Sequence, residues 1–396
     1  MIKRFKVQNY KALRDVSLDL TPIHVLIGPN DSGKTSLLEA IAALCRSVDH
    51  DLSHAFTGAW DGEQLIWHRT RDLPIAMSAS IEGDGKEFEY RISFNFPSTG
   101  RGAFINEEVI LFEPGMEPLK IGQQRDFRSQ VFRAGAQNET ASSDVRRAAL
   151  LVHDSLRGVH SYRWDSRFLG LPVAPDRKRR FRMEPSGFGL ALCLDDILGY
   201  DRDRFIRLES RFKQIFPQFK SIQLIPEAAF RSPTDDPEAI PMLQRADGKG
   251  IYFEFATGGQ RISAHQVSDG VLLVLAYLTI LNLPEPPRVL LIEEPENGIH
   301  PKRLRDVLGI LRDLVSEQNR TQVVMTTHSP YVVDLFQPEE VTICQKQQDG
   351  AVSVRRLSES RPVRDQRDVF TLGEIWTAEG DEALATTVAS GAENSE

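Results

Sequence analysis

Cysteines are scarce in this sequence and long apolar runs are absent, and both features limit what the chain can be. Only Cys45, Cys193 and Cys344 occur among 396 residues. Because they are far apart and odd in number, neither a disulfide framework nor a zinc site is expected. The longest apolar stretch, Val271 to Leu283, is interrupted by polar residues, so we expect no transmembrane helix and no membrane partner.

The chain also lacks a secretory leader and an excess of positive charge. Polar and charged residues follow the opening Met1–Lys6, whereas a secretory signal needs an apolar segment there. We therefore expect a cytoplasmic protein, with a hydrophobic content of 41% that is ample for a sizeable core. The formal net charge of −8 argues against a protein that coats itself in nucleic acid, although a local basic surface is compatible with it.

One local basic segment is Arg177-Lys-Arg-Arg-Phe-Arg182, with five cations and an aromatic ring in six residues. Such a segment can follow the phosphate backbone of DNA. A solvent-exposed loop that pairs with acidic neighbours has the same composition. The sequence leaves both interpretations open.

The segment Gly28-Pro-Asn-Asp-Ser-Gly-Lys-Thr35 fits the phosphate-binding pattern GxxxxGK[ST] and lies between an apolar strand and a helical stretch. In this geometry the glycines allow backbone N–H groups to face the phosphates, Lys34 reaches the β- and γ-phosphates, and the Thr35 hydroxyl binds Mg²⁺. We expect ATP as ligand and Mg²⁺ as cofactor. The predicted nucleotide-binding residues of this P-loop are Asn30, Ser32, Gly33, Lys34, Thr35 and Ser36.

Two carboxylates, Glu293 and Glu294, directly follow the apolar run Val289–Ile292. Strands of a parallel sheet end at the edge where ligands bind. Successive strand residues point in different directions, so we assign Glu293 to the Mg²⁺ shell and Glu294 to the attacking water as general base. A solvated strand end is the alternative.

Two further groups are candidates. His328 follows the apolar strand Gln322–Thr326, where an imidazole can contact the γ-phosphate or hold the water-polarising carboxylate. Ser268 and Gly270 precede a long apolar helix. A serine hydroxyl, a glycine and a helix N-terminus can form a second anion site for a partner's nucleotide, although Ser268 can equally act as an ordinary N-cap.

The pattern of elements predicts an α/β protein. Alternation predicts strands at Gln64–Thr70, Ile75–Glu82 and Phe88–Phe96. In the middle region, Leu192–Phe216 is predicted to be helical and to end at Pro217. After Gln322–Thr326, a further strand at Val341–Cys344 completes a parallel sheet covered by helices. We divide the chain into an N-terminal β lobe with the P-loop (1–96), a middle, largely helical insertion (97–256), a C-terminal lobe with the acid pair and His328 (257–360), and a tail (361–396) that is disordered after about Gly380.

Together, the P-loop, Ser268-Asp-Gly270, Ile292-Glu-Glu-Pro-Glu-Asn-Gly-Ile-His-Pro301 and Thr326-Thr-His-Ser-Pro330 resemble the ABC-type ATPases of the RecF, SMC and OLD group, most closely the compact predicted ATPases without a coiled coil. The resemblance covers nearly the whole chain. It implies a P-loop NTPase fold with an ABC-type head, in which a parallel core sheet is joined by an N-terminal antiparallel β lobe. It also implies a homodimer that sandwiches two ATP molecules, with Ser268 and Gly270 acting in trans and Asn297 to His300 crossing to the opposite subunit.

The sequence departs from this group in three respects. Asp31 replaces a glycine that is frequent in the group's P-loop and brings a negative charge close to the phosphates. We assign no residue to the glutamine that senses Mg²⁺. OLD nucleases continue into a TOPRIM domain, whereas this sequence ends about 50 residues after its last predicted core strand, so we expect no intrinsic nuclease activity.

These observations favour a Mg²⁺-dependent ATPase that dimerises head to tail around ATP. The resemblance implies that the protein controls the engagement of double-stranded DNA or a separately encoded nuclease or toxin effector, in DNA repair or anti-phage defence. An ATP-gated scaffold for a toxin or nuclease, with negligible turnover, is the alternative. The ATPase subunit of a membrane transporter fits less well, because the middle region is long.

Overall fold

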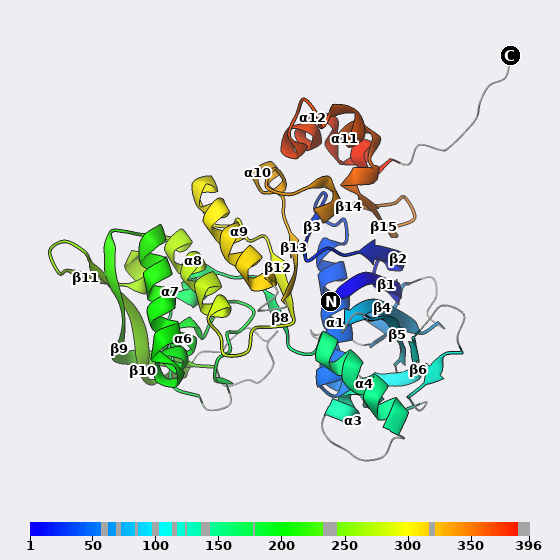
Figure 1. The fold of residues 1–396 in the computed structure, drawn as a ribbon, viewed down its shortest axis with the longest axis horizontal. Helices are drawn as coiled ribbons and strands as arrows, with labels where there is room; N and C mark the ends of the chain where they lie inside the picture. The colour runs from blue at the N-terminus through cyan, green and yellow to red at the C-terminus, as the bar shows by residue number, and fades with distance from the viewer. Residues whose placement is uncertain are drawn as a thin grey trace. The chain divides into compact units, whose positions relative to one another are not determined.

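The computed structural model describes residues 1–56, 62–68, 73–83, 86–96, 103–112, 117–122, 125–135, 143–176, 179–232, 244–316 and 321–386. The chain forms two compact units, and each consists of more than one segment of the sequence. The first comprises Met1–Ala55, Trp60–Leu156 and Val324–Glu396, and the second comprises Phe56–Ala59 and Arg157–Val323. Figure 1 shows the elements of both units.

An antiparallel sheet forms one part of the first unit. Its strand order is β2-β1-β4-β5-β6-β7, with bounds β1 Ile2–Tyr10, β2 Leu13–Asp19, β4 Ile75–Gly83, β5 Lys86–Asn95, β6 Phe104–Leu111 and β7 Leu119–Lys120. Alternate residues such as Phe5, Val7 and Tyr90 are buried. Helices α1 (Lys34–Asp49) and α4 (Ser143–Leu156) contact this sheet. The predicted N-terminal antiparallel sheet is confirmed, and it continues past residue 96 to Lys120.

The other strands of the first unit hold the P-loop. Their order is β15-β14-β3-β13, with bounds β15 Val352–Arg356, β14 Val341–Lys346, β3 Ile23–Ile27 and β13 Gln322–Thr326. Strand β14 runs parallel to β3 and antiparallel to β15. Strands β3 and β13 are buried at every residue, as expected for strands covered on both faces. Helices α10 (Pro330–Val333), α11 (Arg361–Gln366) and α12 (Leu372–Ala385) pack together beside β14.

The second unit contains the beginning of β13, followed in strand order by β12 (Val289–Glu293) and β8 (Val159–Tyr162). Strands β12 and β8 run parallel. Helix α8 (Asp269–Leu281) contacts three longer helices: α6 (Leu190–Tyr200), α7 (Arg202–Ile215) and α9 (Pro301–Val315). The short helix α5 (Ser166–Leu169) also contacts α8.

A second, three-stranded sheet in this unit was not predicted. Its order is β11-β10-β9, with bounds β11 Arg261–Ser263, β10 Gln244–Phe255 and β9 Phe219–Arg231. Strands β9 and β10 form a long hairpin (Figure 1). Stacked rings of Phe212, Phe219 and Phe253 attach the hairpin to α7. The middle region, predicted to be largely helical, is therefore mixed α/β. The strands of the hairpin bury aromatic residues against α7, and a helical period does not describe their pattern.

Three local predictions were wrong. The described part of Gln64–Thr70 contains the 3-10 turn η1 (Gly62–Leu65) and one isolated bridge, Tyr10 to Ile66. The helical stretch Leu192–Phe216 is two helices, because Asp201 leaves α6 in an extended conformation and caps α7 through its side chain. The C-terminal segment continues as α12 to Ala385, with a kink at Gly380.

The remaining described elements are short. They are α2 (Leu52–Ala55), α3 (Gln130–Gly135), η3 (Ala264–Gln266), η4 (Pro338–Glu340) and η5 (Leu357–Glu359). None of the helices in the described ranges has the length and apolar character that crossing a bilayer requires.

Candidate functional site

The P-loop connects β3 to α1 and depends on two glycines for its shape. Gly28 has φ 131°, and a Cβ there would lie 2.2 Å from the carbonyl oxygen of Cys344. Gly33 has φ 92° and lies against Val352. A side chain at either position would meet both backbone strain and a steric clash, so the strand-loop-helix arrangement requires glycine at both.

The start of α1 is suited to an anion. Gly33 is the N-cap and supplies no side-chain hydrogen bond, and the first turn has no acidic residue. The positive end of the α1 dipole therefore faces the loop without an acidic side chain in the first turn, which favours a phosphate there. Thr35 and Ser36 lie in the same turn, and the Thr35 side chain is exposed.

Lys34 is folded back onto the loop. Its Nζ donates to the carbonyl oxygens of Gly28 and Pro29, both at 2.8 Å, and lies 3.4 Å from Ser32 Oγ. The side chain of Ser32 is buried, and Asn30 is exposed at the tip of the loop. Carbonyl oxygens and phosphate oxygens both accept hydrogen bonds from an ammonium group. When a nucleotide binds, Lys34 can therefore replace its bonds to the loop carbonyls with bonds to phosphate oxygens.

The first unit also brings His328 to the P-loop edge. The Thr327 N–H donates to the carbonyl oxygen of Leu26 at 3.1 Å, so the chain beyond β13 continues alongside the end of β3. His328 follows immediately and is exposed after a run of seven buried residues. The Ser329 N–H donates to Thr327 Oγ1 at 3.0 Å, which fixes the backbone on the other side of the imidazole.

Asp31 points away from the loop interior. Its backbone has φ 64°, its side chain is 82% exposed, and it forms a 2.5 Å ion pair with Lys346 at the end of β14. A cavity of about 480 Å³ lies beside this pair. It is lined by Pro29, Asn30, Asp31, Ser32, Gln345, Lys346 and the α12 segment Glu379 to Glu382.

In the second unit, Glu293 and Glu294 lie at the carboxyl end of β12. The Glu293 side chain is 19% exposed and lies 4.0 Å from Arg163. Glu294 leaves the strand with φ 49°, and Asn297 Nδ2 donates to its Oε2 at 2.5 Å. A left-handed conformation at a non-glycine residue costs free energy and is often found at functional positions. Glu293 therefore lies near Arg163, whereas Glu294 accepts a hydrogen bond from Asn297.

Ser268 and Gly270 also belong to the second unit, at the start of α8. Ser268 is the N-cap residue and is exposed, yet its side chain makes no capping hydrogen bond. The nearest atom to a Cβ built at Gly270 is the carbonyl oxygen of Gly298, at 3.5 Å. The turn after Glu294 thus lies beside the α8 N-terminus, and it ends where His300 Nδ1 accepts a hydrogen bond from the Lys302 N–H of α9 at 3.2 Å.

The predicted site residues therefore form two groups. The first unit assembles the P-loop and His328, and the second unit assembles the Glu293–Glu294 pair and the Ser268–Gly270 helix start. Three residues near these groups were not predicted: Lys346, Arg163 and Asn297 as the partner of Glu294. No motif marks Lys346 or Arg163, because only strand pairing brings them to the site.

The donor set fits Mg²⁺. The Thr35 hydroxyl and the Glu293 carboxylate are hard oxygen ligands. Protein-bound Mg²⁺ in nucleotide sites commonly keeps several waters and takes one or two protein ligands together with phosphate oxygens. Each of these two residues is therefore of a type that can supply one ligand to Mg²⁺.

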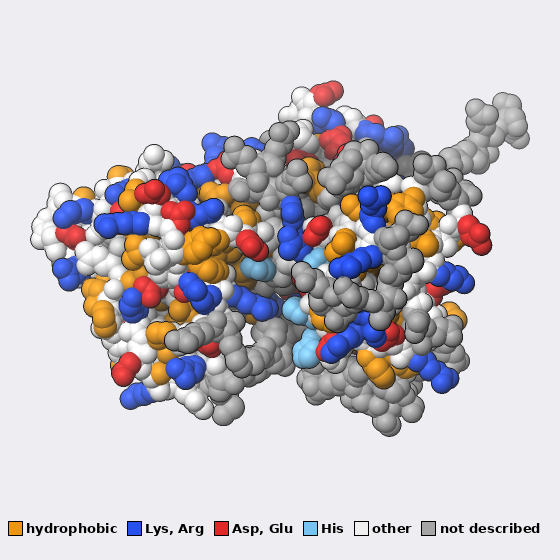
Figure 2. Space-filling view, turned by 60° about the horizontal axis from the view of Figure 1, so that its bottom comes forward, with side chains coloured by type: hydrophobic (Ala, Val, Ile, Leu, Met, Phe, Trp, Pro, Cys, Tyr) orange, Lys and Arg blue, Asp and Glu red, His pale blue; other side chains and the backbone are white. Residues whose placement is uncertain are grey.

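The basic run Arg177-Lys-Arg-Arg-Phe-Arg182 is partly neutralised. Arg177 and Lys178 lie outside the described residues. Arg179 pairs with Asp176 and Glu184, and Arg180 lies 3.5 Å from Asp196. On the face drawn in Figure 2, cationic and anionic side chains are interspersed in the same way. These contacts favour the acid-paired interpretation for Arg179 and Arg180.

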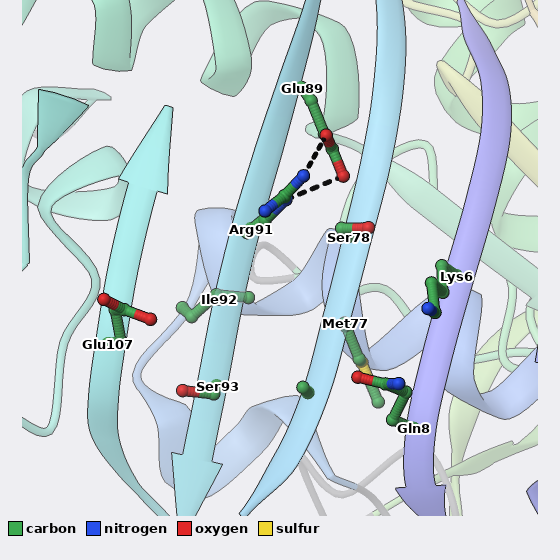
Figure 3. A pocket seen from close by; sticks show the side chains of 10 residues that line it. Lys6, Gln8, Met77, Ser78, Glu89, Arg91, Ile92, Ser93 and Glu107 are labelled. Carbon is green, nitrogen blue, oxygen red and sulfur yellow. Dashed lines mark hydrogen bonds and ion pairs between the residues drawn. The ribbon is translucent and has the colours of Figure 1, made fainter. Parts of the chain in front are cut away.

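A second hollow, of about 260 Å³, lies on the outer face of the antiparallel sheet. Lys6 of β1, Ser78 of β4 and Glu107 of β6 line it (Figure 3). Arg91 donates two hydrogen bonds to Glu89, at 2.8 and 2.7 Å, so these charges satisfy each other. No predicted site residue lines this hollow.

A P-loop between a buried strand and the start of a helix is typical of P-loop nucleotide-binding proteins. Comparison with known proteins identifies the family: residues 23–334 match the family described as "AAA domain, putative AbiEii toxin, Type IV TA system". The match spans most of the chain, so the chain belongs to this family.

One curated relative is the OLD nuclease of Thermus scotoductus (strain ATCC 700910 / SA-01), which is 23% identical over 403 residues. The match covers 97% of this chain and 70% of the relative. Among solved structures, the SMC head domain from Thermotoga maritima has a TM-score of 0.43 at 12% identity, covering 90% of this chain and 98% of that one. The Smc head domain from Pyrococcus furiosus, bound to the C-terminal domain of ScpA, has a TM-score of 0.46 at 10% identity, covering 93% and 99%.

Proposed function

We propose that this protein is a Mg²⁺-dependent ATPase whose hydrolysis site is completed by a second copy of the chain. The observation that carries the proposal is the P-loop, in which Lys34 and the uncapped first turn of α1 surround one potential phosphate position. Because carboxyl ends of parallel strands meet at one edge of a sheet, the acids that follow β12 belong to the same reaction.

Each residue has a role in this proposal. The P-loop backbone, with Asn30 and Ser32 to Ser36, binds the triphosphate, while Thr35 and Glu293 hold Mg²⁺, which neutralises phosphate charge when bound. Glu294 accepts the proton of the attacking water, and the bond to Asn297 supports this role because it orients one carboxylate oxygen. His328 contacts the γ-phosphate.

The proposed dimer follows from the start of α8. Ser268 is exposed and does not cap its own helix, so its hydroxyl is available to an anion supplied from outside the chain. The nucleotide of a second subunit is such an anion. Head-to-tail pairing would then place each ATP between the P-loop of one subunit and Ser268 and Gly270 of the other.

For the biological output, we propose control of double-stranded DNA or of a separately encoded effector, with ATP-driven closure as the switch. Two findings support this direction: the family description names a toxin system, and the curated relative is named a nuclease. The cytoplasm is the proposed location.

The deciding experiment measures ATP hydrolysis by the purified protein with and without linear double-stranded DNA. We expect Glu294→Gln to retain ATP binding, because the substitution preserves shape, and to lose at least about 100-fold in turnover, because the general base is removed. It should also accumulate as an ATP-bound dimer.

Unchanged hydrolysis by Glu294→Gln would remove Glu294 as the base. DNA stimulation that disappears in this variant would support a DNA-sensing ATPase, whereas hydrolysis indifferent to DNA would support a protein effector. Tight ATP binding by the wild type with negligible turnover would instead support the ATP-gated scaffold.

A further inference from the structure

Arg163 lies at the end of β8, beside the proposed catalytic acids. Strands β8 and β12 are neighbours in the sheet (Figure 1). They pair in parallel, with Ile292 opposite Tyr162. The next residues, Glu293 and Arg163, are therefore level with each other. Arg163 Nη1 lies 4.0 Å from Glu293 Oε2, and the Arg163 side chain is 73% exposed.

The backbone that carries Arg163 is held firmly. Its N–H donates to the carbonyl oxygen of Pro185 at 2.9 Å, and the Asp165 N–H donates to that of Ser186 at 2.9 Å. The rings of the flanking residues, Tyr162 and Trp164, contact each other with centroids 5.1 Å apart. Trp164 also packs on Tyr277 of α8, at 4.6 Å. A rigid segment thus presents a largely exposed guanidinium.

The contact between Arg163 and Glu293 is too weak for its contribution to stability to explain why Arg163 lies there. At 4.0 Å, with most of the guanidinium in water, such a pair contributes little to stability. A guanidinium has five donors in a planar fork and suits phosphate oxygens well. The exposed end of a parallel strand, next to a carboxylate proposed to hold Mg²⁺, is where those oxygens would lie.

We propose that Arg163 is a catalytic residue that stabilises the charge on the γ-phosphate during hydrolysis; this inference rests on the proposed function. In that step the water oxygen bonds to the γ-phosphorus, the water proton passes to Glu294, and the bond to the β–γ bridging oxygen breaks with its electron pair leaving on ADP. The Arg163 N–H groups donate to the γ-phosphate oxygens, whose negative charge redistributes as the bond breaks.

The test compares Arg163→Ala and Arg163→Lys with the matched control Arg167→Ala. Arg167 lies four residues further along, is 87% exposed and pairs with Asp165 instead of Glu293. We expect Arg163→Ala to lower kcat by about 100-fold or more at saturating Mg²⁺, with ATP affinity changed by less than about threefold. It should also fail to trap ADP with aluminium fluoride, while Arg163→Lys retains part of both properties.

Several results would overturn the role of Arg163. One such result is that Arg163→Ala hydrolyses ATP at the wild-type rate while Glu294→Gln is inactive. Another is a kcat deficit that excess Mg²⁺ repairs, which would mean that Arg163 only orients Glu293. An equal loss in Arg167→Ala would show a general effect of charge. By contrast, hydrolysis that persists in Glu294→Gln or is absent from the wild type would remove the proposed function itself.

Discussion

At the scale of single residues, two of the six described non-glycine residues with positive φ belong to the proposed site. Glu294 at φ 49° and Asp31 at φ 64° both adopt the left-handed region, which is disfavoured for residues with a Cβ. One follows the strand that carries the proposed metal ligand, and the other lies in the P-loop. In both cases the side chain accepts a hydrogen bond that helps to offset the conformational cost: Glu294 accepts from Asn297, and Asp31 accepts from Lys346.

Asp31 provides a prediction at this scale. Asp31→Asn removes a negative charge near the proposed triphosphate, and asparagine tolerates the left-handed conformation. We expect ATP to bind about two- to fivefold more tightly, because a repulsion across solvent is removed. Equilibrium titration with a fluorescent ATP analogue at low and high salt checks this, since screening should shrink the gain.

The control for this substitution is Asp349→Asn. Asp349 pairs with Arg14 and is not among the residues that line the P-loop cavity, so ATP affinity should not change. An Asp31→Asn variant with wild-type affinity would mean that Lys346 already neutralises Asp31.

At the scale of elements, a buried carboxylate connects β6 to α3. Glu108 is 1% exposed and accepts hydrogen bonds from Tyr90 Oη at 3.0 Å, from the Gln130 N–H at 2.9 Å and from the Val131 N–H at 3.4 Å. Burial raises the pKa of Glu108 to about 7, with a smaller contribution from the negative charge of Asp126. Its hydrogen bonds oppose this rise without cancelling it.

This carboxyl group makes folding depend on pH. A pKa raised from 4.5 to about 7 means that the folded state binds the proton more tightly than the unfolded state. The contribution to stability is fully present below pH 4.5 and is lost as the pH rises through 7. Compared with Glu108→Gln, the wild type should lose about 3 kcal/mol between pH 4.5 and 8.

Urea unfolding of both proteins at several pH values checks this prediction. Other titrating groups, such as the buried His24, whose pKa is lowered by burial, act in both proteins and cancel in the difference. A difference in unfolding free energy that stays constant with pH would contradict the prediction.

At the scale of the whole molecule, the proposed site needs two copies of the chain, and complementation tests this. Lys34→Ala removes the phosphate-binding amine. Ser268→Asp keeps a good N-cap for α8 but repels the partner's γ-phosphate. Each variant alone should be inactive, yet an equal mixture should recover about a quarter of wild-type turnover, because half of the dimers contain one intact composite site.

The rate of the mixture should rise with protein concentration as dimers form, which a dilution series would show. A mixture that stays inactive under conditions where both variants bind to wild-type subunits would contradict the composite site. Activity in Ser268→Asp alone would show that the α8 N-terminus is not needed.

Local sequence determined the P-loop, the acid pair and most of the strands around them. Strand, glycine loop and helix lie within residues 23–49, and their dihedral preferences and hydrophobic period are set by near neighbours. The failures had a common cause. The β9–β10 hairpin and the break at Asp201 depend on aromatic packing and capping that periodicity alone does not encode.

Only the tertiary structure decided which distant side chains meet at these motifs. Lys346 reaches Asp31 across 315 positions, and Arg163 comes level with Glu293 through the register of two strands that are far apart in the chain. Such contacts follow from strand order and register, which depend on the packing of the whole sheet. The sequence therefore predicted the phosphate-binding motif. The positions of Lys346 and Arg163 depend on strand pairing, so only the tertiary structure gave them.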